Sequence, residues 1–566
     1  MAAASLLPSF SPVRTGGQIL VDNLVQQGID LAFCVPGESY LPVLDALYAM
    51  RDKLRLIVCR HEGGAAYMAE AVGKLTGRPG IAFVTRGPGA SNAAIGVHTA
   101  QQDSTPLILF VGQVGTDFVD REAFQEVDYR RMYGSVAKWA AQIDRAERIP
   151  EYVARAFRVA LSGRPGPVVL ALPEDMLSDR ADTVDALPVA IGRVVPAAQQ
   201  IAQLRALLAA SKRPLVIVGG SGWTSEACAK LLRFVEANAL PVACAFRNQD
   251  LVDNEHPHYA GDVGIAINPK LAARMRDADV LLVIGERLGE MVTGGYSLLV
   301  PPASMQPLIH VHPGAEELGR VYQPVLAIEA SIPAFAEAVA AIDPVAAQAW
   351  QGSAAQAHAD YLAWQTPRPV ASALDLWQVV AALRRRLPDD AIVTNGAGNY
   401  TGWLSRLFRY RRYRTQLGPY NGAMGYGVPS AIAAKLVHPE RVVVSWNGDG
   451  CFLMNGQELA TAAQYRANVV FIVVDNGMYG TIRMHQEREY PGRVYATDLA
   501  NPDFAALARA YGVHGETVLR TAEFGPALER ALAAGKPALL HLLADPQAVT
   551  MNATIDEIRA SAAKTV

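Results

Sequence analysis

An aspartate and an asparagine carry the clearest chemistry in the 566-residue sequence. Asp449 lies within Gly448-Asp449-Gly450, and 26 residues separate it from Asn476. Carboxylate and amide oxygens are ligands that suit Mg²⁺, which usually completes its coordination with phosphate and water. The flanking glycines allow the backbone to approach a phosphate closely. These residue types predict a magnesium–diphosphate site, with a tight turn and a helix-capping Asn as the simpler alternative.

The sequence between these two residues has the pattern of a strand–helix–strand unit. Residues 442–446 and 469–474 are short apolar runs, which are typical of buried parallel strands. Between them, Asn455 and Glu458 have the spacing of a helix start with a capping carboxylate. A parallel crossover brings both strand ends to one edge of a sheet, where open α/β sheets bind ligands. This shared edge favours the metal–diphosphate interpretation.

A Gly-Asp-Gly turn followed at this distance by Asn resembles the thiamine diphosphate signature of the 2-oxo acid decarboxylase and acetolactate synthase superfamily. The resemblance implies thiamine diphosphate and Mg²⁺ as cofactors. It also implies that the metal ligands are Asp449, Asn476 and the backbone carbonyl of Met478. The predicted cofactor-binding set of the same segment further includes Gly448, Gly450 and Cys451.

Two more glycine-rich turns match the family's cofactor site. Residues 396–400 follow an apolar strand at 392–394, and such a turn can hold a diphosphate at a helix N-terminus. In residues 422–427, the resemblance implies that Met424 supports the bent cofactor and that the Gly422 carbonyl accepts a hydrogen bond from its 4′-amino group. Without the resemblance, a methionine here is more typical of core packing. The residues assigned to the diphosphate turn are Gly398, Asn399 and Tyr400.

Glu62, within Arg60-His61-Glu62-Gly63-Gly64-Ala65, is the predicted proton-transfer residue of the first domain. The segment follows an apolar strand at 56–58 and opens a helix, so stabilisation of the helix N-terminus is an equal alternative from the residues alone. The resemblance implies that Glu62 bonds N1′ of the aminopyrimidine and promotes the imino tautomer that removes the C2 proton. This role needs a carboxyl group that holds a proton near neutral pH, which burial favours. His61 is interpreted as structural.

Other motifs of the first domain match the acetolactate synthase-like branch. Residues 87–92 resemble the family's turn after the next strand, and Gly112-Gln113 matches a pair whose Gln faces the cofactor. Residues 123–126 match a run beside the substrate entrance, and Lys138 stands where those enzymes carry a basic residue. Singly, Phe124 is equally explained by core packing and Lys138 by surface charge. The predicted set is Gln113 as a catalytic residue and Phe124, Gln125 and Lys138 as substrate contacts.

Two positions depart from the acetolactate synthases. His485 stands where those enzymes carry the Trp that shapes the second-substrate pocket, and Thr481, a predicted substrate contact, stands where they carry Met. The pocket is therefore expected to be more polar or differently shaped, which leaves acetolactate open as the product. His485 is predicted to bind substrate or transfer protons, with a solvated histidine as the alternative.

The central part of the chain gives a weaker signal for a second cofactor. Residues 219–222 (Gly-Gly-Ser-Gly) follow an apolar strand, but Ser225 stands where a dinucleotide-binding turn requires its last glycine. Acetolactate synthases bind FAD in this domain, partly through a segment similar to Arg-Phe-Asp-Asp-Arg-Val-Thr-Gly. Residues 287–294 keep the first Arg and the final Val-Thr-Gly and lose the acidic middle. FAD is therefore left open.

Length and pattern predict an α/β protein with three doubly wound parallel-sheet domains. Helical patterns alternate with apolar strands, the clearest of which are 81–84, 107–111, 215–218 and 280–284. Irregular sequence at 187–197 and at 344–372 is interpreted as linkers between domains. The predicted domains span 12–185, 196–345 and 372–550, and the resemblance implies that they are the pyrimidine-binding, central and diphosphate-binding domains of the family.

Composition and charge are those of a globular protein. Hydrophobic residues make up 51% of the sequence and charged residues 19%, and the net charge of −3 gives no support for nucleic acid or an anionic membrane as a partner. The five cysteines are scattered without metal spacing, which predicts a reduced, cytoplasmic protein. No apolar run approaches the ~18 residues of a membrane span. Residues 1–12 lack the basic start of a secretory signal.

The resemblance implies an enzyme that decarboxylates a pyruvate-like 2-oxo acid and ligates the resulting enamine to a second carbonyl compound. The alternative enzyme is a 2-oxo acid decarboxylase or a benzaldehyde lyase-like C–C lyase. A nucleotide-binding regulatory protein without catalysis is disfavoured, because Glu62 and Asp449 are both present. Family precedent places the two ends of the cofactor on different subunits, which predicts a homodimer or homotetramer.

Overall fold

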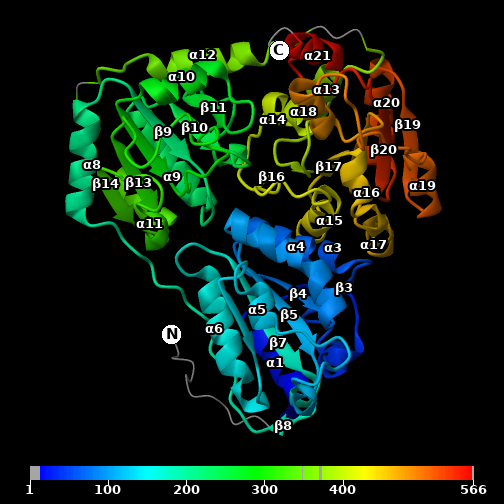
Figure 1. The fold of residues 1–566 in the computed structure, drawn as a ribbon. Coiled ribbons are helices and arrows are strands. Elements are labelled where there is room, and N and C mark those ends of the chain that lie inside the picture. Colours follow the sequence, from blue (N-terminus) through cyan, green and yellow to red (C-terminus); the bar gives the residue numbers. More distant parts are fainter. Residues whose placement is uncertain (1–12, 347, 369–371, 564–566) are drawn as a thin grey trace. The chain divides into compact units, whose positions relative to one another are not determined.

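The computed structural model describes residues 13–346, 348–368 and 372–563 (Figure 1). The chain forms two compact units, one ending at Gly192 and the other beginning at Arg193. The first unit contains one six-stranded sheet and the second contains two, and neighbouring strands in all three run parallel. The predicted α/β class with three parallel sheets is confirmed. The expectation about a secretory signal concerns residues that lie outside the described ones.

The sheet of the first unit has the strand order β3-β2-β4-β5-β7-β6. The order reverses between β2 and β4, as in doubly wound folds. β4, β5 and β7 are buried along their whole length, which explains their continuous apolar sequences. The strands are β2 (Leu31–Cys34), β3 (Arg55–Val58), β4 (Gly80–Val84), β5 (Leu107–Gln113), β6 (Trp139–Gln142) and β7 (Pro167–Pro173), with a small antiparallel pair of β1 (Arg14–Thr15) and β8 (Arg180–Ala181). The helices are α1 (Gly16–Gln26), α2 (Leu41–Ala49), α3 (Glu62–Thr76), α4 (Gly87–Asp103), α5 (Tyr129–Tyr133), α6 (Ile149–Leu161) and α7 (Glu174–Ser178).

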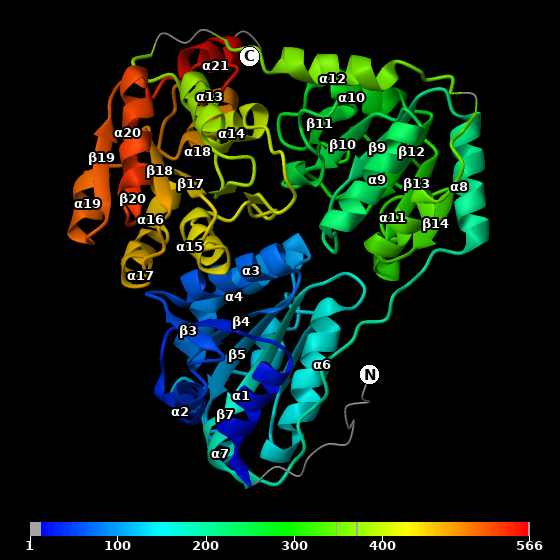
Figure 2. The same cartoon turned by 180° about the vertical axis from the view of Figure 1, so that it is seen from behind.

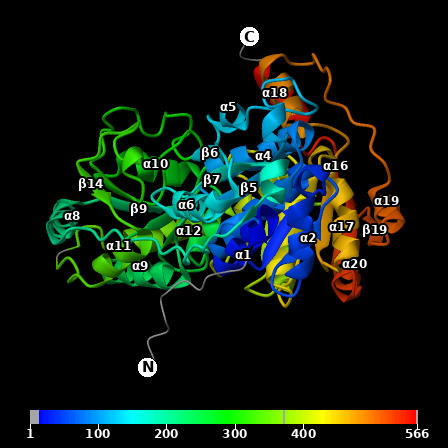
Figure 3. The ribbon, with the colours of Figure 1, turned by 90° about the horizontal axis from the view of Figure 1, so that it is seen from below.

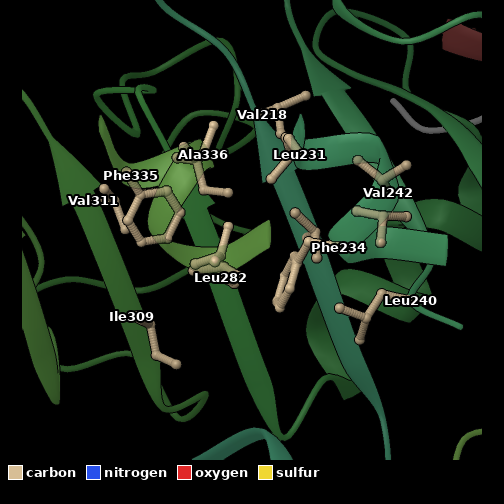
Figure 4. Packing of buried hydrophobic residues seen from close by; sticks show 14 of the residues in the cluster. Val218, Leu231, Phe234, Leu240, Val242, Leu282, Ile309, Val311, Phe335 and Ala336 are labelled. Carbon is tan, nitrogen blue, oxygen red and sulfur yellow. The ribbon is translucent and has the colours of Figure 1, made fainter. Parts of the chain in front are cut away.

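The first sheet of the second unit has the order β11-β10-β9-β12-β13-β14, which reverses between β9 and β12. Figure 4 shows its core, where Phe234 of α9 and Phe335 of α11 pack with Val218, Leu282 and Val311 of the strands. The strands are β9 (Pro214–Val218), β10 (Val242–Ala245), β11 (Tyr259–Val263), β12 (Val280–Ile284), β13 (Leu308–His312) and β14 (Leu326–Glu329). The helices are α8 (Ala198–Ala210), α9 (Ser225–Ala237), α10 (Pro269–Asp277), α11 (Ile332–Ala340) and α12 (Ser353–Trp364).

The two stretches interpreted as linkers differ in structure. Residues 182–197, all of them described, form neither helix nor strand. The stretch 344–372, by contrast, contains α12, which lies beside α10 (Figure 2). The prediction that this stretch is irregular throughout is therefore wrong. The buried residues of α12 are Ala354, Ala357 and Tyr361. Two alanines and one tyrosine form a narrow apolar stripe, which gives a weak signal in the sequence. The predicted domain boundaries stay predictions.

The last sheet has the order β16-β15-β17-β18-β20-β19, which reverses between β15 and β17. Figure 3 shows α19 beside β19 at one edge. β17 and β18 are buried at every position, as expected of apolar parallel strands. The strands are β15 (Ile392–Asn395), β16 (Gln416–Leu417), β17 (Val443–Gly448), β18 (Val470–Asp475), β19 (His514–Val518) and β20 (Ala538–Leu543). The helices are α13 (Leu376–Arg386), α14 (Thr401–Leu407), α15 (Gly427–Val437), α16 (Asp449–Leu453), α17 (Leu459–Gln464), α18 (Gly480–Glu489), α19 (Phe504–Ala510), α20 (Thr521–Ala533) and α21 (Ile555–Ala562).

The helix start predicted from Asn455 and Glu458 is wrong in detail. A short helix, α16, already begins at Asp449, and a 3-10 turn (Gly456–Glu458) precedes α17. The Asn455 amide donates to the Gly425 carbonyl (3.1 Å) instead of capping a helix. Asn455 thus makes a tertiary hydrogen bond, which the local spacing of residues does not predict. Among the described residues, no helix combines the length and apolar character that crossing a bilayer requires.

Candidate cofactor site

A cavity of about 260 Å³ lies at the carboxyl ends of β15, β17 and β18, where the order of the last sheet reverses. At such a reversal, connections from adjacent strands leave on opposite sides and open a crevice. Every cofactor-binding residue predicted in this part of the chain lines the cavity, together with Thr481 of α18. These residues are Gly398, Asn399, Tyr400, Gly422, Met424, Gly448, Asp449, Gly450, Cys451, Asn476 and Met478.

Asp449 is a buried carboxyl group held by three donors. Its Oδ1 accepts a hydrogen bond from the Gly450 N–H (2.8 Å), and its Oδ2 accepts from the Gly477 N–H (3.0 Å) and from Asn501 Nδ2 (2.8 Å). Burial, with a further contribution from nearby Asp475, raises the pKa of Asp449 to about 6. A bound cation would stabilise the charged form of such a group. Asp449 is therefore a buried, hydrogen-bonded carboxyl group at the cavity, and its role as a metal ligand stays a prediction.

Asn501, Asp475 and His541 extend this network, and sequence reasoning missed all three. Asn501 Nδ2 donates to Asp475 Oδ1 as well as to Asp449, in each case over 2.8 Å. Asp475 Oδ2 lies 2.9 Å from His541 Nε2. Although burial acts in the opposite direction, hydrogen bonds from His541 and Asn501 lower the pKa of Asp475. The sequence around Asn501 signals only the start of α19, which Asp503 caps.

The donor set fits Mg²⁺ bound together with a diphosphate. Within the described residues, no group of three or more His, Cys, Asp and Glu side chains could hold a metal ion. The three predicted ligands, Asp449, Asn476 and Met478, instead all line the cavity. Mg²⁺ commonly takes few protein ligands and completes its shell with phosphate and water. In addition, the Asn501 Oδ1 acceptor is buried without a hydrogen-bond partner.

Glycines shape the cavity wall around Tyr400. A Cβ added at Gly448 would lie 2.6 Å from Tyr400 Cδ1, so only glycine lets the ring approach the end of β17. Gly398 has a φ of +142°, which favours glycine for backbone reasons as well. At Gly422 a Cβ would meet nothing within 4 Å, and the φ of +67° alone favours glycine there. Burial raises the pKa of the Cys451 thiol, so Cys451 is a neutral part of the wall.

α18 contributes to the cavity through its first turn. Thr481 and Ile482 line the cavity, whereas His485 is exposed and contacts Arg488. Near the end of α18, the buried Glu487 carboxylate accepts hydrogen bonds from Arg559 of α21 (2.7 and 2.8 Å) and from Arg483 (3.0 Å). The Arg559 guanidinium lowers the pKa of Glu487 to about 2. This ion pair joins α18 to the last helix, and it was not predicted.

In the first unit, Glu62 is the first residue of α3, so its charge still suits the helix N-terminus, but its side chain is not the N-cap. His61 is the N-cap of α3, and its Nδ1 accepts a hydrogen bond from the Gly63 N–H (3.0 Å). The Glu62 carboxylate accepts instead from Asn92 Nδ2 (2.9 Å), and a Cβ added at Gly89 would lie 3.3 Å from Glu62 Oε1. The structure therefore brings the 87–92 motif to Glu62 and gives His61 a structural role. The proton-transfer role of Glu62 stays a prediction.

The other predicted residues of the first unit fall into two groups. Gln113, the last residue of β5, donates from Nε2 to the Val127 carbonyl (2.9 Å), and the Gln125 carbonyl accepts from the Gly87 N–H (3.1 Å). Gln113 therefore contacts the loop that contains Gln125, and this loop lies beside the 87–92 motif. Phe124, in the same loop, is 74% exposed, so core packing does not explain it. Lys138 donates instead to the carbonyls of Ser162 and Arg164 (2.7 Å each). Its contacts are therefore those of a structural lysine.

Comparisons with known proteins agree with this site. Models of the thiamine pyrophosphate enzymes match residues 14–132 as the N-terminal TPP binding domain, residues 201–339 as the central domain and residues 396–542 as the C-terminal TPP binding domain. The chain belongs to the thiamine pyrophosphate enzymes. The predicted superfamily is confirmed, as is its cofactor, thiamine diphosphate.

Full-length relatives of this thiamine pyrophosphate enzyme are acetolactate synthase large subunits. The chain is 32% identical to the isozyme 2 large subunit of Escherichia coli strain K12, over 94% of this chain and 95% of that protein. It is 31% identical to the probable large subunit of Methanocaldococcus jannaschii (94% and 92% covered) and to the large subunit of Corynebacterium glutamicum (92% and 86%). The acetolactate synthase-like branch predicted from the motifs is therefore confirmed.

Proposed function

We propose that this thiamine pyrophosphate enzyme decarboxylates a pyruvate-like 2-oxo acid and ligates the remaining carbon unit to a second carbonyl compound. The observation that carries the proposal is the cavity where the last sheet reverses, which gathers the predicted residues of three separate turns. Similarity to acetolactate synthases over 94% of the chain supports the same chemistry. Thiamine diphosphate supplies the nucleophilic carbon and the electron sink that this chemistry requires.

Mg²⁺ is the proposed partner of the diphosphate, held by Asp449, Asn476 and the carbonyl of Met478. The buried carboxyl group of Asp449 supports this assignment, because hard oxygen ligands suit Mg²⁺. The turn at 396–400 would hold the diphosphate, and Met424 would support the thiamine. In the first unit, Glu62 would hold the proton that the aminopyrimidine exchanges, with Asn92 orienting its carboxylate.

The decisive experiment incubates the purified full-length chain, thiamine diphosphate and Mg²⁺ with a panel of 2-oxo acids, with and without aldehydes, and identifies the products by mass. We expect CO₂ release and a 2-hydroxy ketone or 2-hydroxy acid that contains carbon from both substrates. Aldehyde alone as the product would favour the decarboxylase alternative, and cleavage of an added 2-hydroxy ketone would favour the lyase. No turnover of any 2-oxo acid would contradict the proposal.

His485→Trp tests the predicted acceptor pocket. A broad apolar ring at this position should favour a small 2-oxo acid acceptor over an aldehyde, by roughly 1–3 kcal/mol, while donor decarboxylation changes much less. The product ratio in a competition between pyruvate and an aldehyde measures the shift. Glu489→Trp is the matched control, because it adds the same bulk at another exposed position of α18. An unaltered ratio in the His485 variant would show that this residue does not reach the acceptor.

FAD binding stays open, and we propose that the glycine turn of the central domain does not hold it. The turn follows β9 where its sheet reverses, but a Cβ added at Gly219 would lie 2.6 Å from Oε2 of the buried Glu286. Tyr420 holds the other oxygen of Glu286 through its hydroxyl (2.8 Å). The Glu286 carboxylate therefore lies beside the turn, where a doubly wound sheet would bind a dinucleotide diphosphate. We expect the purified protein to lack flavin absorbance and to leave added FAD unbound in a titration, and a stoichiometric flavin would contradict this.

A homodimer or homotetramer is the proposed assembly. Support comes from three large apolar side chains that the first unit exposes within a short segment, Phe118, Val119 and Phe124. Light scattering of the purified protein measures the number of subunits, and a monomer that is fully active would contradict the proposal. The cytoplasmic location stays a prediction.

A further inference from the structure

The polar groups of Asn399, in the turn at the cavity, are engaged in hydrogen bonds. Its backbone N–H donates to Thr481 Oγ1 (2.9 Å), and its Oδ1 accepts from the same hydroxyl (3.1 Å). Its Nδ2 donates to the Val549 carbonyl (3.1 Å), and its own carbonyl accepts from the Gly402 N–H (2.9 Å). Each polar group of Asn399 thus has a hydrogen-bond partner within the protein.

These bonds connect three segments that are far apart in the sequence. Asn399 belongs to the turn after β15, and Thr481 to the first turn of α18, five residues beyond Asn476. Val549 lies between β20 and α21, lines the cavity, and packs with Met478 and Ile555 in a small buried cluster. The side chains of Asn399 and Thr481 therefore join these three segments, and each segment has a residue that lines the cavity.

We propose that Thr481 is a positioning residue, whose hydroxyl fixes the diphosphate-binding turn against α18 and the C-terminal segment before the cofactor arrives. The inference rests on the proposed function for the identity of the ligand, and it replaces the predicted substrate contact of Thr481. In this proposal Asn399 contributes to diphosphate binding by holding the shape of the turn. Its backbone N–H donates to Thr481 and so does not donate to a phosphate. A turn that is already ordered loses less conformational freedom on binding, which strengthens binding.

The hydroxyl and the methyl group of Thr481 can be tested separately. Thr481→Val keeps the shape and removes the hydroxyl, whereas Thr481→Ser keeps the hydroxyl and removes the methyl group. In the cofactor-free full-length protein, we expect amide hydrogen exchange of residues 396–403 to be faster in the Val variant, and to remain near the parent rate in the Ser variant. This measurement requires neither cofactor nor activity, so it is independent of the proposed function.

Titration with thiamine diphosphate and Mg²⁺ gives the second readout. Loss of one or two neutral hydrogen bonds should weaken binding by roughly 3- to 10-fold in the Val variant, and the Ser variant should restore it. If the parent protein binds no thiamine diphosphate, the proposed function fails while the exchange result still stands. If the parent binds and the Val variant matches it in both exchange and affinity, the positioning role of Thr481 is wrong.

A substrate-wall role predicts the opposite pattern. If Thr481 instead contacts substrate, the contact is made by its methyl group. Thr481→Ser would then alter the ratio of products from competing acceptors, and Thr481→Val would resemble the parent in cofactor affinity. Should the Val variant fail to fold, Thr481→Ala replaces it, and the comparison is then between Ala and Ser. Both lack the methyl group and only Ala lacks the hydroxyl, so equal exchange rates in these two variants would overturn the proposal.

Discussion

Asp449→Ala is expected to remove tight binding of thiamine diphosphate with Mg²⁺ while the protein stays folded. Asp449 is the one carboxylate in the proposed ligand set. Loss of a group that merely supports a metal ligand commonly costs roughly 10- to 100-fold in affinity, so we expect loss of the ligand itself to cost at least roughly 100-fold. Isothermal titration of the cofactor-free protein with thiamine diphosphate in excess Mg²⁺ measures this loss directly.

The fold should survive because two of the three donors to Asp449 keep another acceptor, and the third, the Gly450 N–H, lies in the first turn of α16. The Gly477 N–H and Asn501 Nδ2 each also donate to Asp475 Oδ1, over 3.0 and 2.8 Å. The variant therefore leaves neither donor buried and unpaired, which is the costly outcome of removing one partner. Circular dichroism and a thermal melt check this point before the titration is interpreted.

The matched control is Asp498→Ala, because Asp498 has an 80% exposed side chain on a neighbouring segment of the same unit. It removes an equal charge without touching the cavity, so its cofactor affinity should remain close to that of the parent. If Asp449→Ala and Asp498→Ala bind equally well, Asp449 is not a metal ligand and the magnesium assignment fails.

The parallel strands could be predicted well from the sequence. The apolar run 280–284 coincides with β12, and the runs 442–446 and 469–474 locate β17 and β18 to within two residues. Strands that are buried on both faces must be apolar throughout, so a short window of sequence contains the whole signal. Since parallel strands align their carboxyl ends, the meeting of Asp449 and Asn476 followed from the same signal.

The hydrogen-bond partners around the site could not be predicted in this way. Asn501 reaches Asp449 across 52 positions of sequence, and Thr481 reaches Asn399 across 82. Such pairs depend on how loops are placed over the end of a sheet, and no local period encodes that placement. The same limit explains Asn455, whose spacing to Glu458 suits a helix cap but whose amide bonds to Gly425. Local rules therefore located the predicted metal ligands at the cavity and missed the side chains that hydrogen-bond to Asp449.

Glu62→Gln is expected to slow exchange of the C2 proton of bound thiamine diphosphate by ~10²–10⁴-fold, the usual effect of losing a positioned proton-transfer group. The substitution keeps the shape of the side chain, and the Gln carbonyl oxygen can still accept from Asn92 Nδ2, as the Glu62 carboxylate does over 2.9 Å. What it removes is the ability to take up and release a proton. Hydrogen–deuterium exchange at C2, quenched and followed by NMR, measures the step itself.

His61→Ala separates this role from stabilisation of the helix. Because His61 Nδ1 is the cap that accepts the Gly63 N–H, its removal should lower the free energy of unfolding by about 1 kcal/mol while C2 exchange remains near the parent rate. Glu62→Gln should show the reverse, with a nearly unchanged unfolding free energy and much slower exchange. If C2 exchange stays fast in Glu62→Gln, the bonded pair of Glu62 and Asn92 is structural, and another group must accept the proton.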